Sequence, residues 1–397
     1  MKRAYVDHAS ATPVKKPVIE AMLPYFDQHF GNPSTVYDMG SKIKQVMEEQ
    51  RAKVAKLIGA RAEEIILIGA RAEEIIFTSS GAEANNLAIK GVALAGQKKG
   101  NHIIISAIEH HSVLNSARFF ERMNFEVTFL PVDEYGLVDP ERLLGPETIL
   151  VSIMHANNEI GTIEPISELS AICREKGIIF HTDAVATVGN IPVDVNELNV
   201  DLLSISGVSL GAPKGVGALY FRDKLRLMPL IHGGIQESGR RGGTENVPAI
   251  VGLGKASELA LEELAQNEIH MRELRDALVS GIHERIDQIK YTGHPEKRLP
   301  GHASFCISAI EGEALIYMLN QHGIYANTGS ACASKALKTS PVLVAIGVPP
   351  ALAQGSIVFT MNSTNTMEDI EHILNKLPLV VERLRDLSPI WRENKAA

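Results

Sequence analysis

Cys332 lies in a setting that favours thiol chemistry. Small and polar residues surround it in segment 328–334, whereas a structural cysteine is usually buried among apolar neighbours. The nearby Lys335 favours the thiolate, which is the nucleophilic and metal-ligating form of the side chain. The sequence therefore predicts a reactive or ligating thiol at Cys332. Cys173 and Cys306 lie in a helical and an apolar segment, and we expect both in the core.

Three polar clusters follow apolar, strand-like segments. The turn at 79–82 precedes a helix start, where free backbone N–H groups suit a phosphate, although an ordinary strand-to-helix turn looks the same. His110, in the second cluster, could stack on a planar cofactor or serve only the fold. Asp183, in the third cluster, could pair with a pyridinium nitrogen or cap the following helix.

The elements that must position these residues are short apolar segments separated by helical patterns. Continuously apolar segments suit strands that are buried on both faces. They cover residues 103–106, 127–130, 149–152, 178–181, 202–205 and 217–220. This alternation predicts an α/β fold with a mostly parallel sheet covered by helices. Ligands bind at the carboxyl ends of the strands in such sheets, which is where the polar clusters lie.

The pattern changes near residue 249, and this change predicts a second domain. A long helical stretch at 251–275 leads into a further set of elements that ends near Arg392. We expect a large α/β domain at 15–255. A smaller α+β domain would combine 1–14 with 256–397 and carry the Cys332 segment.

Residues 57–66 are repeated without change at 67–76. Two short copies do not make a solenoid, which needs three or more longer units. We interpret the repeat as a local tandem duplication, tolerated as an extended helix or loop. The second copy is contiguous with Phe77, so we expect it to supply the strand at 75–78.

Composition excludes several classes of protein. The 397 residues carry a net charge of −8, and 45% of them are hydrophobic, which gives no basic stripe for nucleic acid or a membrane surface. No apolar segment reaches the length of a membrane span, and the N-terminus lacks the apolar core of a signal peptide. Three cysteines do not suggest a disulfide framework, so a cytoplasmic location is the simplest expectation.

In combination and in this order, the motifs resemble a cysteine desulfurase of the IscS/NifS type. The motifs are Glu109-His110-His111, Asn157-Asn158-Glu159-Ile160-Gly161-Thr162, His181-Thr182-Asp183-Ala184, Arg241-Gly242-Gly243-Thr244-Glu245-Asn246 and Gly329-Ser330-Ala331-Cys332. The resemblance extends almost end to end. It implies the aspartate aminotransferase-like fold of the transferases that depend on pyridoxal phosphate (PLP), and it implies a homodimer.

The resemblance also implies roles for residues around the PLP ring. In the family, a histidine stacks on the ring, an asparagine holds the ring oxygen and an aspartate pairs with the pyridine nitrogen. These positions carry over to His110, Asn157 and Asp183. The loop cysteine that attacks the substrate sulfur and becomes a persulfide carries over to Cys332.

Further positions carry over as contacts to the PLP phosphate. Gly81 and Ala82 lie in the phosphate turn, and Ser206 matches another phosphate contact. Thr244 matches a contact that the second subunit of the homodimer lends.

The chain departs from the family pattern where the chemistry is expected. Ser209 stands where the family has the lysine that forms a Schiff base with PLP, and Val208 replaces the neighbouring histidine. Ala82 replaces a threonine of the phosphate turn, and Ala186 replaces a glutamine near the ring. Val358 replaces an arginine that holds the substrate carboxylate. These changes predict a pocket in which PLP catalysis is impaired.

Two hypotheses about function follow. The first is a desulfurase-like protein of iron–sulfur cluster assembly, which transfers sulfur or ligates a cluster through Cys332, with an IscU-like scaffold protein as its partner. PLP would then be noncovalent or absent. The alternative is a slow but genuine PLP-dependent desulfurase that converts L-cysteine to L-alanine and an enzyme persulfide. The sequence favours the first, because Cys332 remains while the pocket has changed.

Overall fold

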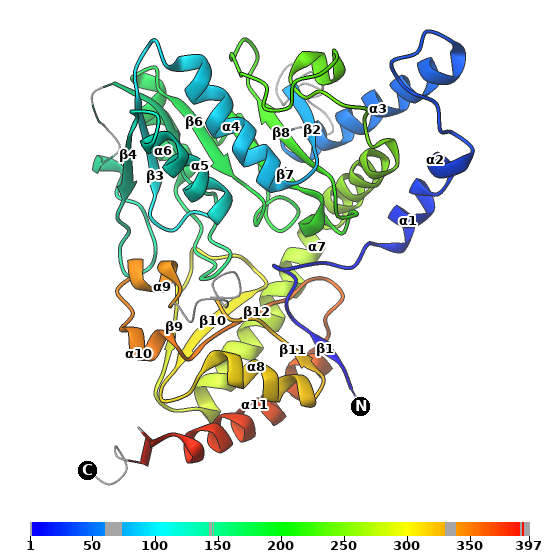
Figure 1. Cartoon of the computed structure of the whole chain (residues 1–397). Helices are drawn as coiled ribbons and strands as arrows, with labels where there is room; N and C mark the ends of the chain where they lie inside the picture. The colour runs from blue at the N-terminus through cyan, green and yellow to red at the C-terminus, as the bar shows by residue number, and fades with distance from the viewer. Residues whose placement is uncertain are drawn as a thin grey trace.

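A seven-stranded sheet organises the larger part of the chain (Figure 1). Its strand order is β2-β8-β7-β6-β5-β3-β4. β8 runs antiparallel to both of its neighbours, and all other adjacent strands pair in parallel. The strands are β2 (Ile75–Thr78), β3 (His102–Ser106), β4 (Glu126–Leu130), β5 (Thr148–Ser152), β6 (Ile179–Asp183), β7 (Leu202–Ser206) and β8 (Gly217–Phe221). The predicted strands and the mostly parallel sheet are confirmed.

The computed structural model describes residues 2–59, 74–142, 145, 147–329, 339–389 and 391–392. The predicted reactive thiol at Cys332 lies outside the described residues, and so do residues 60–73 of the duplication. The strand predicted at 75–78 is present as β2. No helix in the described part of the chain combines the length and apolarity that a membrane crossing requires.

Helices cover both faces of this sheet, as its continuously apolar strands require. In β3, Ile104 packs with the core on one face, and Ile103 and Ile105 pack with the core on the other. The first core includes residues of α3, α6 and α7, and the second includes residues of α4 and α5. Their bounds are α3 (Asp38–Leu57), α4 (Gly81–Gly96), α5 (His111–Glu121), α6 (Ile166–Glu175) and α7 (Val247–Arg285). Short elements complete this part: α1 (Lys16–Met22), α2 (Pro24–Asp27) and the single turns η2 (Pro140–Arg142), η3 (Gly207–Leu210) and η4 (Gln236–Gly239).

A second, smaller sheet has the antiparallel order β12-β10-β9. Helices from the C-terminal third of the chain pack around it (Figure 1). The elements are β9 (Ile289–Tyr291), β10 (His302–Ile307), α8 (Gly312–Gln321), β11 (Ile324–Tyr325), α9 (Pro341–Ala345), α10 (Pro350–Ala353), β12 (Ser356–Thr360) and α11 (Met367–Leu387). The N-terminal strand β1 (Ala4–Tyr5) pairs in parallel with β11, so the chain start packs with this domain as predicted.

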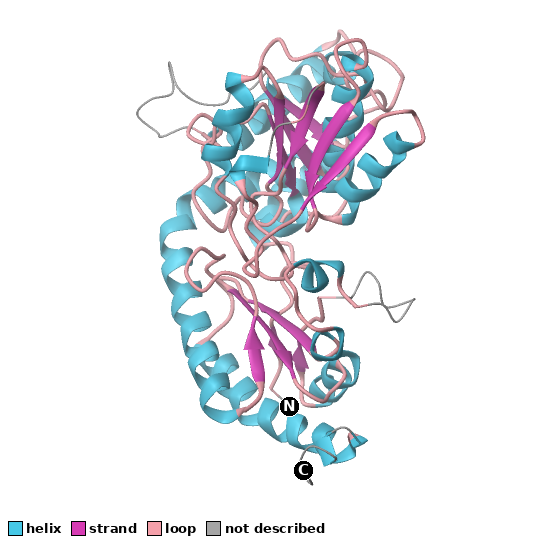
Figure 2. Ribbon diagram, turned by 90° about the vertical axis from the view of Figure 1, so that its left-hand side faces the viewer, coloured by secondary structure: helices cyan, strands magenta, loops and turns pink. Residues whose placement is uncertain are grey.

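α7 joins the two parts as one continuous helix of 39 residues (Figure 2). The side chain of Asn246 caps its start by accepting a hydrogen bond from Ala249 N at 3.3 Å. Residues from Val247 to Ala260 pack in the core of the large sheet, and residues from Leu274 to Ile282 pack in the core of the small one. The predicted domain limits stay a prediction, and the limit at 255/256 falls inside this helix.

Candidate functional site

A cavity of about 510 Å³ lies where strand ends of the large sheet meet the small domain. Its walls include residues that directly follow β2 and β3 and residues at the carboxyl ends of β6 and β7. From the small domain, residues after β1 and β11, two residues of α9 and one residue of β12 complete the wall. A volume of this size suits a cofactor or a drug-sized ligand. The rule that ligands bind at strand carboxyl ends located this cavity correctly.

Most of the predicted cofactor ligands are brought together in this cavity. Those that line it are Gly81, Ala82, His110, Asp183 and Ser206. The five positions that depart from the family pattern line it as well: Ala82, Ala186, Val208, Ser209 and Val358. The five positions therefore lie in one cavity, and that each departs from the family pattern stays a prediction.

One end of the cavity is the N-terminus of α4. Ser80 is the N-cap residue, and its Oγ accepts a hydrogen bond from Glu83 N at 3.1 Å. The backbone N–H groups of Gly81 and Ala82 precede the first intrahelical hydrogen bonds, so they remain available to an anion. A Cβ atom on Gly81 would lie 2.7 Å from Val185 Cγ2, which is too close, so this backbone approaches the wall only because residue 81 is glycine.

A hydrogen-bonded chain connects Asp183 to His110 beneath the cavity. Asn85 Nδ2 donates to Asp183 Oδ2 at 2.6 Å and to Ser112 Oγ at 2.8 Å. The Oγ of Ser112 lies 2.7 Å from His110 Nδ1. Burial raises the pKa of Asp183, while hydrogen bonds from Val185 N and Asn85 act in the opposite direction. A bound cationic ring nitrogen would favour the carboxylate form of Asp183.

Asn85 and Ser112 were not singled out from the sequence. Both lie close to the starts of helices, where a polar residue looks like an ordinary helix-start residue. The adjacency of Asn85 to the phosphate turn was the only sequence signal.

Asn157, the predicted ring ligand, is not among the residues that line the cavity. Its Nδ2 donates to Ile108 O at 2.8 Å, and its Oδ1 accepts from Glu159 N at 2.8 Å and Ile160 N at 3.0 Å. These bonds hold the turn after β5, because they replace backbone hydrogen bonds that a turn lacks. A contact from Asn157 to a cofactor ring stays a prediction.

Ser209 lies on the single turn η3, which directly follows β7, and it lines the cavity. Its Oγ donates to Ser206 O at 2.9 Å, so the hydroxyl hydrogen is used within the turn. Lys214 is exposed and does not line the cavity. Among the described residues of the lining there is no lysine and no arginine.

Two further carboxyl groups lie in the cavity wall. Glu109 is 3% exposed, and its Oε1 accepts from Ser106 Oγ at 2.8 Å and Met154 N at 2.7 Å. Burial raises the pKa of Glu109 well above its ordinary value. Burial also raises the pKa of Glu159 to about 7, although Ser340 Oγ donates to Glu159 Oε2 at 2.5 Å. The sequence motifs contained both residues but assigned them no role.

Thr244 is exposed and does not line the cavity of its own chain. Its neighbour Arg241 reaches the N-terminus of α4, where Arg241 Nε lies 3.0 Å from Glu83 Oε1. A contact from Thr244 to a second subunit's phosphate site stays a prediction. Within the described ranges, no cluster of three or more His, Cys, Asp or Glu residues could hold a metal ion.

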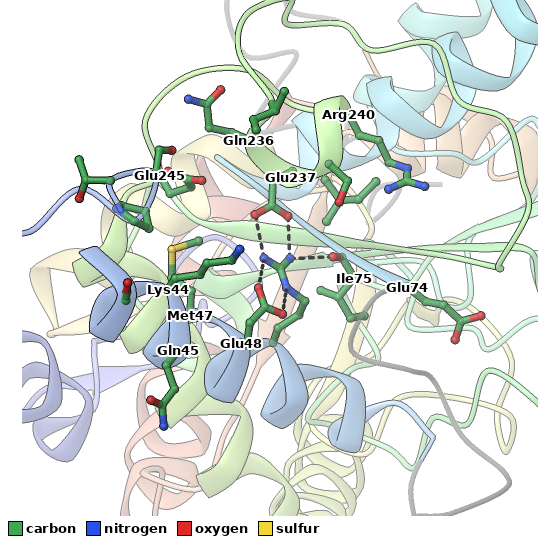
Figure 3. Close-up of a pocket in the computed structure, with 18 of the residues that line it drawn as sticks. Lys44, Gln45, Met47, Glu48, Glu74, Ile75, Gln236, Glu237, Arg240 and Glu245 are labelled. Atoms are coloured by element: carbon green, nitrogen blue, oxygen red, sulfur yellow. Dashed lines mark hydrogen bonds and ion pairs between the residues drawn. The ribbon is translucent and has the colours of Figure 1, made fainter. Parts of the chain in front are cut away.

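A second cavity, of about 1230 Å³, is lined by residues of α3, β2 and the 235–245 segment (Figure 3). Arg51 and Glu237 form a two-point ion pair in its wall, with Arg51 Nη1–Glu237 Oε2 at 2.6 Å and Nη2–Oε1 at 3.0 Å. Its lining contains none of the predicted site residues. This pair fixes the segment that carries Arg241 and Thr244 against α3.

Comparisons with known proteins agree with this architecture. A family model described as "Aminotransferase class-V" matches residues 4–373. The cysteine desulfurase IscS of Dictyoglomus turgidum is 50% identical, and the match covers 100% of both chains. The cysteine desulfurase IscS of Methanosarcina thermophila is 48% identical over 98% of this chain and 94% of its own. A solved NifS-like protein superposes with a TM-score of 0.88 at 37% identity, covering 96% of this chain and 100% of its own.

The chain belongs to the class-V aminotransferase family, in the group of the IscS/NifS cysteine desulfurases. The fold of the PLP-dependent transferases, predicted from the motifs, is therefore confirmed.

Proposed function

We propose that this protein handles sulfur through Cys332 in iron–sulfur cluster assembly, and that PLP catalysis in its cavity is impaired. The observation that carries the proposal is the composition of the cavity wall. All five departures from the family pattern line it, and no lysine or arginine lies among its described residues. Thiolate chemistry at Cys332 needs exposure and a lowered pKa, and it does not need a lysine at position 209.

The residues present fit PLP as a noncovalent ligand. The N–H groups of Gly81 and Ala82, together with Ser206, would hold the phosphate, because Gly81 leaves the backbone open there. Asp183 would face the pyridine nitrogen. When bound, PLP would supply an electron sink for amino-acid substrates. The lysine amine that would link PLP covalently is missing, because Ser209 stands at the position where the family has that lysine.

Ser209 is also a poor replacement in proton transfer. General acid–base groups typically contribute about 10²–10⁴-fold to a rate. A serine hydroxyl does not ionise near neutral pH, and the hydrogen of Ser209 is directed to Ser206 O. Any reaction in this cavity would therefore lack both an amine and a base at that point.

The alternative is a slow PLP-dependent cysteine desulfurase that acts on L-cysteine with noncovalent PLP. The hydrogen-bonded chain from Asp183 through Asn85 and Ser112 to His110 favours it, because it keeps the ring end of the cavity ordered. The names of the relatives support cysteine as the substrate in this alternative.

The proposal extends to partners and location. A homodimer would let the exposed Thr244 of one subunit reach the cavity of the other. An IscU-like scaffold protein would receive the sulfur or share an iron–sulfur cluster with Cys332. A cytoplasmic location would suit a free thiol of this kind.

A spectroscopic and enzymatic comparison tests the proposal. The purified protein is incubated with and without PLP, its visible spectrum is recorded after borohydride treatment, and sulfide release from L-cysteine is assayed. We expect no PLP fixed by borohydride in the protein and no turnover above background. In a separate assay, the parent should accept sulfur from an added persulfide donor, or an added cluster, and Cys332→Ser should not. Cys306→Ser is the matched control, because Cys306 is buried. Robust sulfide release from L-cysteine would contradict the proposal.

A further inference from the structure

The 510 Å³ cavity is lined by residues of both domains. At the large-domain end, the N-terminus of α4 and the hydroxyl of Ser206 present donors and a positive helix dipole. At the small-domain end, the wall is formed by residues that follow β1 and β11, by Pro341 and Val342 of α9 and by Val358 of β12. That second end contains a carboxyl group, that of Asp7.

Asp7 and Val358 are fixed in place by the same neighbour, Asn327. Asn327 Nδ2 donates to Asp7 Oδ1 at 3.1 Å and to Ser10 Oγ at 2.6 Å. The backbone of Asn327 exchanges two hydrogen bonds with Val358, at 2.7 and 3.1 Å. The amide hydrogens of Asn327 are therefore used, and they are not free to bind an incoming anion.

Nothing in the described wall neutralises Asp7. The described lining has no lysine or arginine, and its other carboxyl groups are Glu109, Glu159 and Asp183. His110 and His111 lie on the large-domain side. A ligand carboxylate at the small-domain end would meet an apolar side chain, Val358, and a like charge, Asp7, and both are unfavourable for it.

We propose that this cavity selects ligands with a phosphate at one end and a neutral or cationic group at the other, and that Asp7 and Val358 exclude an α-carboxylate. The inference rests on the proposed noncovalent binding of PLP-type ligands in the cavity, and it names their class: phosphopyridoxyl amines rather than phosphopyridoxyl amino acids. Free L-cysteine, which carries an α-carboxylate, is thereby disfavoured as a ligand.

Two stable secondary amines that differ only in the carboxylate test the selectivity. Phosphopyridoxyl-ethylamine and phosphopyridoxyl-L-alanine are titrated into the purified full-length protein by calorimetry, so the readout is binding and not activity. We expect the ethylamine compound to bind about tenfold or more tightly, because a repelled and unpaired carboxylate is costly. Equal binding, or tighter binding of the alanine compound, would overturn the inference, and so would binding of neither.

Variants at the small-domain end show whether these residues cause the selectivity. Val358→Arg should tighten the alanine compound selectively, since arginine binds carboxylates by two parallel hydrogen bonds. Asp7→Asn should narrow the difference in affinity between the two ligands. Because it is a smaller change, it still tests the assignment if Val358→Arg fails to fold. Ile269→Arg, at an exposed position on α7, is the matched control for added charge. An unchanged ratio in both Val358→Arg and Asp7→Asn would refute the assignment.

These outcomes are distinct from those that judge the role of Cys332. Loss of the binding selectivity leaves sulfur transfer through the thiol untouched. A failure of the Cys332→Ser experiment, in turn, leaves the ligand preference of the cavity measurable.

Discussion

Glu237→Gln should destabilise the protein by removing one charge from a buried ion pair. The side chains of Arg51 and Glu237 are 8% and 3% exposed. Glu237 Oε2 accepts from Arg51 Nη1 at 2.6 Å and from Phe77 N at 2.9 Å, and Oε1 accepts from Arg51 Nη2 at 3.0 Å. A glutamine can keep its oxygen at the Oε2 position, but its amide nitrogen then faces Arg51 Nη2 as a second donor.

The structure sets the size of this effect. Removing one partner of a buried ion pair costs about 3–5 kcal/mol. We expect the lower end, because Glu48 still contacts Arg51 Nε at 3.1 Å. With an unfolding entropy of about 2.1 cal/mol/K per residue over 397 residues, a loss of about 3 kcal/mol lowers Tm by about 4 °C.

Thermal melts of three proteins test the reasoning: the parent, Glu237→Gln and Glu48→Gln. Glu237 has φ 46°, and glutamine meets the same backbone constraint, so the comparison isolates the charge. Glu48 is 51% exposed, and its substitution should change Tm by less than about 1 °C, as exposed pairs contribute little. The reasoning is refuted if Glu237→Gln melts with the parent, or if both variants lose the same amount.

Three further predictions concern the cavity and its surroundings. Gly81→Ala should weaken PLP binding by about tenfold or more, because overpacking costs about 1–3 kcal/mol, whereas Gly96→Ala at the far end of α4 should not; equal affinities in a fluorescence titration would contradict this. Burial raises the pKa of Glu164 in the folded protein to about 8, whereas a glutamate in the unfolded chain has a pKa of about 4.3. The folded state therefore holds this proton more tightly, and the stability that Glu164 contributes is lost as pH rises from about 5 to 8. Glu164→Gln should remove this loss of stability with rising pH. If the urea unfolding midpoints of the variant and the parent change with pH in parallel, Glu164 does not cause the effect. Native thiol titration should detect one fast thiol, absent in Cys332→Ser, because burial raises the pKa of Cys173 and Cys306 to about 12; three fast thiols would show that these two are accessible.

The sequence predicted the elements that local apolarity determines. The strands of the large sheet are continuously apolar because both of their faces are covered, and this pattern is visible without a structure. The strand-end rule then located His110 and Asp183 at one cavity.

Contacts that depend on tertiary structure were not predictable in this way. Asn85 reaches Asp183 across 98 residues of sequence, and no local pattern reports that approach. The contact between Asp7 and Asn327 arises because β1 pairs with β11, which brings together residues that are 320 positions apart in the sequence. Asn157 was predicted as a ring ligand, but its side-chain amide forms hydrogen bonds to the neighbouring backbone at Ile108 and Glu159.

The continuity of α7 has a mechanical consequence for the cavity. A helix of 39 residues is about 58 Å long at 1.5 Å per residue, and hydrogen bonds along its whole length resist bending. Because its two halves are embedded in different cores, α7 sets the spacing between the two sheets. Bending between the domains would have to distort this helix or release one of its ends from its core. The width of the cavity therefore depends on the backbone of α7, and a protein redesigned to accept a bulkier ligand would need changes along α7 as well as in the cavity wall.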